Sequence, residues 1–269
     1  MTREVWLTRH PYLQLVADFQ VQVETALSVV PITYPATPDW DDYLYDFRDG
    51  VPLLHSTGAA LNLEPAQEVI KCLMEELASK PLRPRIAKEI SALAAELRNE
   101  KDAPRRIVRW LINEGDSTST YPGLLRCLGW AALRRFLRVT VNVFGEWRDE
   151  ERWLRRYCPT CGSLPAMAQL VGFDAGRTRL LSCGGCSTRW RYRRTGCPFC
   201  ETNDEHRLSV VAIEGENGLR IDYCGSCGGY LKTYDGGELF LLEDWTSLHL
   251  DVIARDRGMK RLATSLYEL

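Results

Sequence analysis

The sequence predicts an α+β protein in which a helical N-terminal half is followed by two cysteine-rich modules and a short C-terminal helix. Three observations support this expectation. Apolar residues recur at helical spacing through most of residues 11–157, four Cys-x-x-Cys pairs follow, and β-branched runs separated by glycine turns lie between those pairs. We therefore expect a helical domain at 1–152, a first module at 153–192, and a second module with the terminal helix at 193–269.

Composition narrows the class of protein. The chain has 269 residues, of which 45% are hydrophobic and 26% charged, values typical of a globular domain with a sizeable core. Its N-terminus carries an early acid and no apolar run, and no stretch approaches the ~18 apolar residues of a membrane span. We expect a cytoplasmic location, where structural disulfides are rare, so the ten cysteines indicate metal or redox chemistry.

Four apolar stripes predict amphipathic helices that pack into a bundle of five or six, because no helix buries its stripe alone. The stripes are Leu15, Phe19, Val23, Leu27 and Val30; Ala66, Ile70, Leu73 and Leu77; Ile86, Ile90, Leu93 and Leu97; and Leu128, Ala132, Phe136, Val139 and Val143. Pro65, Pro84 and Pro104 lie near the expected helix starts, where a missing N–H costs little. Residues 31–62 are expected to be irregular with short helical turns.

The C-terminal half has a different pattern. Two β-branched runs, Ser209–Ile213 and Leu219–Tyr223, flank a turn-like Gly-Glu-Asn-Gly segment and predict a hairpin. Residues 244–258 return to helical spacing.

Eight cysteines in four Cys-x-x-Cys pairs predict two four-cysteine metal sites, because two intervening residues let both thiolates of a turn face one ion. They are Cys158, Cys161, Cys183, Cys186, Cys197, Cys200, Cys224 and Cys227. A C-P-x-C pair is followed by a C-G-x-C pair 25 and 27 positions later in the two halves of this region, so the pairs form a repeat. The repeat favours sequential pairing into two tandem rubredoxin-like (zinc-ribbon-like) modules, with cross-braced pairing as the alternative.

The occupant of these sites is left open by the residues. Zinc and iron both accept four thiolates, so each module could hold either metal, two ions in all. Redox dithiols or buried apolar cysteines are the competing interpretation, although catalytic dithiols usually occur singly at a helix start. Cys72 and Cys127 fall on helical stripes and are expected to pack in the core.

The cysteine region resembles a known family, the formate dehydrogenase accessory protein FdhE, over about residues 158–257. The matching motifs are Cys158–Pro165, Arg179, Thr188, Trp190, Arg194, Asp222, Cys227–Lys232, Asp244, Ser247, Leu248 and Leu250–Asp251. The chain departs from the family pattern at Leu180, Glu243 and Trp245–Thr246.

The resemblance implies a cytoplasmic accessory protein or chaperone for the assembly or activation of a respiratory formate dehydrogenase. It implies binding of the catalytic subunit before export, rubredoxin-like sites for iron or zinc, and no enzymatic activity. The residues at family motif positions outside the cysteines then become candidates for a partner surface with exposed side chains. They are Trp190, Arg194, Tyr230, Lys232, Asp244 and Asp251.

Two other functions compete with this one. The basic and aromatic stretch Arg189–Arg194 suits a partner surface, a nucleic-acid surface, or a strand with solvated arginines. A zinc-ribbon nucleic-acid-binding regulator is the main alternative, and the net charge of −2 argues against it. A thiol oxidoreductase would need free dithiols, which metal binding removes.

The four histidines give no catalytic pattern. His206 is expected to be a solvated loop residue, because eight thiolates already fill two sites. His10, His55 and His249 have no companion acid, base or nucleophile at a recognisable spacing. No phosphate loop, G-x-S-x-G or H-E-x-x-H motif is present.

Overall fold

Helices form most of the first 147 residues. The computed structural model describes residues 2–113, 115–116, 119–172, 176–216, 218–237, 243–263 and 265–267. Its α-helices are α1 (Arg3–Arg9), α2 (Gln14–Val29), α3 (Trp40–Asp49), α4 (Glu64–Ala78), α5 (Pro84–Asn99), α6 (Ala103–Leu111), α7 (Pro122–Trp147) and α8 (Leu248–Asp256). Within these described ranges, no helix has the length and apolar character that crossing a bilayer requires.

The predicted stripes correspond to α2, α4, α5 and α7, and prolines occupy the first turns of α4, α5 and α6 as expected. Two helices differ from the prediction. Helix α1 precedes the first predicted stripe, and α3 lies inside the segment expected to be irregular. In α3 the Asp39 side chain accepts from the N–H of Asp41, and Gly50 ends the helix in the left-handed region. These capping interactions stabilise α3, although the composition of this segment did not predict a helix.

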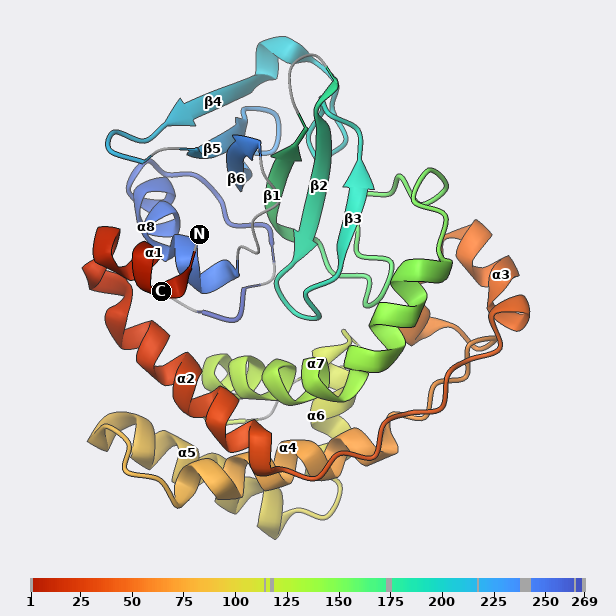
Figure 1. The fold of residues 1–269 in the computed structure, drawn as a ribbon, viewed down its shortest axis with the longest axis vertical. Helices are drawn as coiled ribbons and strands as arrows, with labels where there is room; N and C mark the ends of the chain where they lie inside the picture. The colour runs from red at the N-terminus through yellow and green to blue at the C-terminus, as the bar shows by residue number, and fades with distance from the viewer. Residues whose placement is uncertain are drawn as a thin grey trace.

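One six-stranded sheet follows the helices (Figure 1). Its strands, in sequence order, are β1 (Pro165–Val171), β2 (Thr178–Cys183), β3 (Arg189–Tyr192), β4 (Leu208–Ala212), β5 (Leu219–Cys224) and β6 (Tyr230–Gly237). In space the order is β3-β2-β1-β6-β5-β4, so each module contributes three antiparallel strands. The predicted hairpin is confirmed as β4 and β5.

The two modules are joined at the centre of the sheet. Strands β1 and β6 pair in parallel, with Met167 opposite Lys232 and Ala168 opposite Thr233. The tandem ribbons of the sequence prediction therefore share one continuous sheet, whose outer edges are β3 and β4. The domain boundaries expected near residues 152 and 192 remain a prediction.

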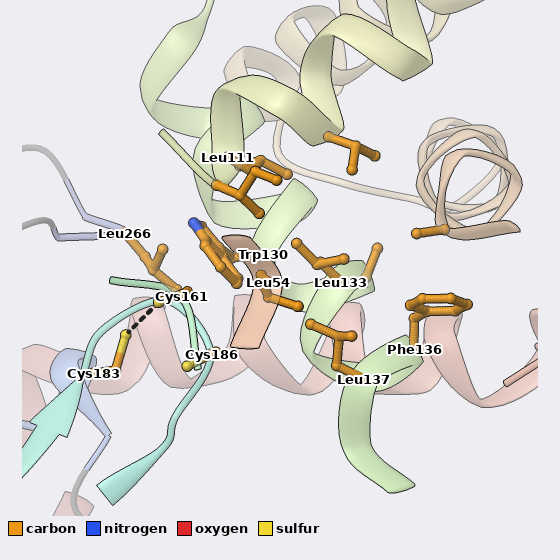
Figure 2. Packing of buried hydrophobic residues seen from close by; sticks show 14 of the residues in the cluster. Leu54, Leu111, Trp130, Leu133, Phe136, Leu137, Cys161, Cys183, Cys186 and Leu266 are labelled. Atoms are coloured by element: carbon orange, nitrogen blue, oxygen red, sulfur yellow. Dashed lines mark hydrogen bonds between the residues drawn. The ribbon is translucent and has the colours of Figure 1, made fainter. Parts of the chain in front are cut away.

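The main hydrophobic core extends from the helices into the first cysteine module. Helix α7 lies between the sheet and helices α4–α6 (Figure 1) and buries Trp130, Phe136 and Phe144 completely or almost so. Figure 2 shows the Trp130 ring between Leu111 of α6 and the cysteine group that contains Cys161. The first module is thus packed into the helical half by apolar contact, which supplies most folding free energy.

A second, smaller core joins the two ends of the chain. Trp6 of α1 belongs to one apolar cluster with Leu219 and Ile221 of β5, Trp245 just before α8 and Leu248 at the start of α8. The Trp6 indole N–H donates to the backbone oxygen of Thr246 at 3.1 Å. The N-terminal helix therefore covers the second module, and Figure 1 shows α1 beside α8. The packing of α1 therefore connects the N-terminus of the helical half to the second module.

A single glycine tests the packing between α7 and the first module. A Cβ added at buried Gly185 would lie 2.8 Å from the Trp130 ring atom Cε2, which is too close for a real contact. We expect Gly185→Ala to lower the free energy of unfolding by about 1–3 kcal/mol through overpacking. Chemical denaturation measures this change.

Gly145→Ala is the matched control. Gly145 is exposed near the end of α7, and a Cβ there meets nothing within 4 Å. Alanine should stabilise this position by roughly 0.5–1 kcal/mol because glycine is a poor helix former. Equal effects of the two substitutions would show that Gly185 does not mediate close packing.

Candidate metal centres

Four similar turns present the eight cysteines. In each turn the backbone N–H of the first cysteine donates to the carbonyl five residues later, over 2.9–3.0 Å. The residue four after that cysteine has a positive φ in every turn: Gly162, Ser187, Glu201 and Gly228, at 75°, 63°, 61° and 73°. The repeat in the sequence therefore corresponds to four turns with the same backbone geometry. This geometry explains two of the glycines directly, because glycine adopts this conformation without steric cost.

The first cysteine group consists of Cys158, Cys161, Cys183 and Cys186, all buried. The Sγ atoms of Cys158 and Cys186 are 3.4 Å apart, as are those of Cys161 and Cys183. Beside the sulfurs, the hydroxyls of Thr160 and Thr188 are 2.7 Å apart.

The helical half holds this group from two sides. The Arg134 guanidinium on α7 donates to the carbonyl oxygens of Gly184 and Gly185 at 2.8–3.0 Å. The N–H groups of Leu53 and Leu54 donate to the carbonyls of Pro159 and Thr160, both at 2.9 Å. Both turns of the first group are therefore fixed by residues from outside the module.

The second group consists of Cys197, Cys200, Cys224 and Cys227, and it is more accessible. Cys200 is exposed and Cys227 is partly exposed, whereas Cys197 and Cys224 are buried. The Sγ atoms of Cys197 and Cys227 are 3.8 Å apart, and those of Cys200 and Cys224 are 3.7 Å apart. This difference in exposure is the main asymmetry between the two centres.

Both groups fit a tetrahedral metal ion. Sulfurs about 2.3 Å from a shared ion lie about 3.8 Å apart, close to the separations in the second group and slightly longer than those in the first. All eight cysteines are free thiols rather than disulfides. Burial raises the pKa of Cys224, but hydrogen bonds from the N–H groups of Cys227 and Ser226 and from the Cys197 and Cys200 thiols together bring it down to about 7, which favours a thiolate ligand. Each group could thus hold one ion, and sequential rather than cross-braced pairing is confirmed.

The partner surface expected from the motif residues requires a correction. Lys232 is only 1% exposed, and its ammonium lies 2.5 Å from Oδ1 of Asp244 and 2.8 Å from Oδ2 of Asp251. Arg261 approaches both carboxylates at 3.4 Å, and the Tyr230 hydroxyl donates to Asp251 at 2.6 Å. The expectation that Lys232 is exposed was therefore wrong, because central strand β6 turns this lysine into the protein, where the two aspartates balance its charge.

Two motif residues on or after β3 have opposite environments. Trp190 is fully buried, and its indole N–H donates to the carbonyl of Arg155 at 2.9 Å. Arg194 is exposed and lies at a cleft of about 250 Å³ beside the second cysteine group. Of the six residues expected on the partner surface, five are buried in this conformation and Arg194 is exposed.

Three arginines of the basic stretch Arg189–Arg194 bond to acidic or polar groups elsewhere in the protein. Arg189 donates to Gln169, and Arg191 pairs with Glu151. Arg193 donates to the carbonyl of Glu201 at 2.9 Å. These contacts favour the strand interpretation over a nucleic-acid surface, but Arg189, Arg191 and Arg193 bond to protein groups instead of being solvated as expected.

The histidines differ in environment. His206 is exposed, as expected, and His55 lies 3.2 Å from the carbonyl of Cys161. His10 and His249 lie close to each other and to Glu216, although the sequence gave them no companion. These three residues are far apart in the chain, so only the fold brings them together.

Each cysteine group should account for one bound ion. We expect Cys161→Ser and Cys200→Ser each to reduce the metal content from two ions to about one, as measured by elemental analysis. Cys161→Ser should also reduce the helical circular dichroism signal, because the first group belongs to the main core and structural metal binding contributes ~10 kcal/mol or more. Cys200→Ser should leave the helical signal in place.

Cys72→Ser is the control for these substitutions. Cys72 lies on α4 outside both groups, so this variant should keep two ions. Protein that contains no iron or zinc and has ten titratable thiols would contradict both metal centres.

The buried ion cluster predicts a pH-dependent cost for Lys232→Met. Burial opposes ionisation of Asp244, but Lys232 and Arg261 outweigh it and lower its pKa below the ordinary 3.8. This stabilisation is present above the unfolded pKa and is lost as the pH falls through the folded value. Removing the lysine leaves two buried carboxylates with Arg261 as their one nearby cation among the described residues, and it should cost roughly 3–5 kcal/mol near pH 7, with a smaller deficit in acid.

Unfolding of the wild type and Lys232→Met from pH 4 to pH 8 measures the effect. Lys88→Met, at an exposed position of α5, should change stability by no more than ~0.5 kcal/mol. A pH-independent deficit in Lys232→Met would indicate lost packing rather than lost charge pairing.

The chain resembles several known proteins. The family model described as "FdhE, central domain" matches residues 157–194. A protein FdhE homolog of Aquifex aeolicus (strain VF5) is 33% identical over 115 residues, which are 41% of this chain and 41% of that protein. A protein FdhE homolog of Proteus mirabilis (strain HI4320) is 31% identical over 139 residues, 49% of this chain and 44% of that protein.

A solved structure extends the likeness to the whole fold. The crystal structure of the FdhE protein from Pseudomonas aeruginosa matches with a TM-score of 0.66 and 22% identity, covering 95% of this chain and 88% of that one. At this identity the match supports the fold alone. The sequence matches span less than half the length of the two curated relatives. Together these similarities confirm the resemblance that the cysteine-region motifs indicated.

Proposed function

We propose that this chain, which matches the FdhE central-domain model over residues 157–194, is a cytoplasmic accessory protein for a respiratory formate dehydrogenase. It would bind the catalytic subunit during assembly or activation, without itself catalysing a reaction. The observation that supports this proposal is the pair of four-cysteine centres, at the positions of the family's motifs, in a fold that matches a solved FdhE protein.

The cysteine centres support a non-enzymatic role. Four thiolates complete the coordination of a tetrahedral ion, so neither centre offers the open position that a catalytic zinc site keeps for water or substrate. Iron in such a site could exchange an electron without changing its ligands, whereas zinc would serve structure alone. Both occupants are compatible with an assembly factor.

The second centre is the better candidate for contact with a partner. The first centre is covered by α7 and by the segment around Leu53, whereas the second exposes Cys200. Beside it lies the 250 Å³ cleft, lined by Arg194, Phe199, Val210 and Tyr223 among others. Val210 is 57% exposed although it is apolar.

Strand β4 gives this cleft a means of recognising a protein chain. It is an edge strand, so one side of its backbone is not paired within the described sheet. An extended segment of a client can add to such an edge, with main-chain hydrogen bonds providing affinity and side-chain pockets providing specificity. We therefore place the partner surface at Arg194, β4 and the cleft, in place of the buried motif residues.

Substitutions in the cleft test this surface. Arg194→Ala and Val210→Asp should keep two ions and a native melting temperature, because exposed substitutions usually cost within ~0.5 kcal/mol. Each should weaken binding of the formate dehydrogenase catalytic subunit by roughly 2 kcal/mol, about 30-fold, if it removes a binding hot spot. Calorimetry with the purified subunit measures the affinity.

Exposed residues on distant helices provide matched controls. Arg98→Ala on α5 and Val29→Asp on α2 change the same residue types and should leave the affinity unchanged. Unchanged binding by the cleft variants would exclude this surface. A gene deletion that leaves respiratory formate dehydrogenase activity intact, together with no binding by the wild type, would reject the accessory function itself.

A further inference from the structure

A third group of metal-ligand side chains lies away from the cysteines. It consists of His10, Glu216 and His249, whose ligand atoms all lie within 4.8 Å of one another. His10 follows α1, Glu216 lies in the turn between β4 and β5, and His249 belongs to α8. Three segments more than 30 residues apart in sequence therefore meet at one point.

The ring of His10 is oriented for a ligand role. Its Nδ1 lies 3.0 Å from the carbonyl oxygen of Trp6, which can only accept a hydrogen bond, so Nδ1 carries the proton. Its Nε2 faces Glu216, at 2.8 Å and 2.9 Å from the two carboxylate oxygens. Metal-binding histidines commonly donate their other N–H to a carbonyl or carboxylate in this way. The ring is 4% exposed and stacks on Trp6 at a centroid distance of 4.0 Å.

His249 provides an independent indication of a missing partner. Both of its ring nitrogens are buried, and neither has a hydrogen-bond partner. Its Nε2 lies 2.9 Å from Oε1 of Glu216 without the geometry of a hydrogen bond. A cation placed between the two imidazoles and the Glu216 carboxylate would coordinate Nε2 of His249 and would be balanced by that carboxylate.

We propose that His10, Glu216 and His249 form a third metal site for a divalent cation of the zinc class. Imidazole nitrogens and one carboxylate are ligands that zinc accepts at about 2.0–2.2 Å, and three protein ligands leave a position for water. The site contains no sulfur, so it differs in chemistry from the two cysteine centres. Bound there, the ion would link α1, the β4–β5 turn and α8.

Cobalt provides a direct probe in the 269-residue chain when its cysteine centres are already filled with zinc. We expect one further equivalent of Co²⁺ to bind with visible d–d absorption and without the thiolate charge-transfer band that binding at cysteine would give. Glu216→Gln and His249→Asn should each weaken this binding by about 100-fold or more, since loss of outer-shell support alone costs 10–100-fold.

Stability gives a second readout that does not depend on colour. Zinc at about 100 times its dissociation constant should raise the melting temperature of the wild type by roughly 5 °C. The same addition should have little effect on Glu216→Gln, which keeps the size of the side chain and removes its charge. The exposed residue His206 is the control, and His206→Ala should behave as the wild type.

Two outcomes would overturn the third site. One is the absence of a third equivalent up to about 1 mM cobalt, so that any binding would be weaker than that of a specific metal site. The other is equal binding by the wild type, Glu216→Gln and His249→Asn. In either case the three residues form only a histidine–carboxylate ion pair.

Discussion

The parallel pairing of β1 with β6 is the constraint on which the other features of the fold depend. It joins the three strands of each cysteine module into one sheet and puts β6 at the centre. Side chains of β6 project from the faces of the sheet, and Lys232 projects to the face that the segment carrying Asp244 and Asp251 covers, so it is only 1% exposed. Its charge must then be balanced inside the protein, and Asp244 and Asp251 lie within 3 Å of it. The segment from Asp244 into α8 is therefore fixed against the sheet by charge as well as by apolar contact.

Local patterns in the sequence predicted the elements well. The stripe from Leu15 to Val30 became α2, and the run from Ser209 to Ile213 became β4 with a slip of one residue at each end. Spacing alone also predicted how the cysteines pair, because each turn is a local structure with its own hydrogen bonds. Where a few neighbouring residues determine the outcome, the sequence is sufficient.

Features that depend on distant segments were missed. The sequence around Lys232 does not reveal that its strand, β6, pairs with β1, where the opposite residue, Met167, lies 65 positions earlier. The burial of Lys232 therefore could not be predicted from the sequence. His10 and His249 appeared to lack companions because Glu216 reaches them only after the β4–β5 hairpin forms and α1 returns to the second module. Arg194, by contrast, is exposed, as expected for a candidate of the partner surface.

The two cysteine centres differ in how strongly the rest of the fold depends on them. Sulfurs of the first centre are part of the main core, under Trp130, and both of its turns bond to helical residues. Loss of its ion would leave buried thiols and a disrupted core, so this centre serves the whole fold. The second centre contributes Cys197 and Cys224 to the same core but leaves Cys200 at the surface. Natural selection could therefore use the second centre for contact with a partner at less cost to stability.

The β4–β5 hairpin connects the proposed docking cleft with the proposed third metal site. Val210 lies on β4 at the cleft, and Glu216 lies in the turn at the far end of the same hairpin. An ion held by Glu216, His10 and His249 would restrict the turn and, through paired β5, the edge to which a client strand adds. A ligand that orders one end of a hairpin reduces the entropy lost when a second ligand binds the other end. Because such coupling is reciprocal, client binding at β4 would strengthen metal binding by the same factor, and Glu216→Gln would abolish the coupling while leaving both cysteine centres intact.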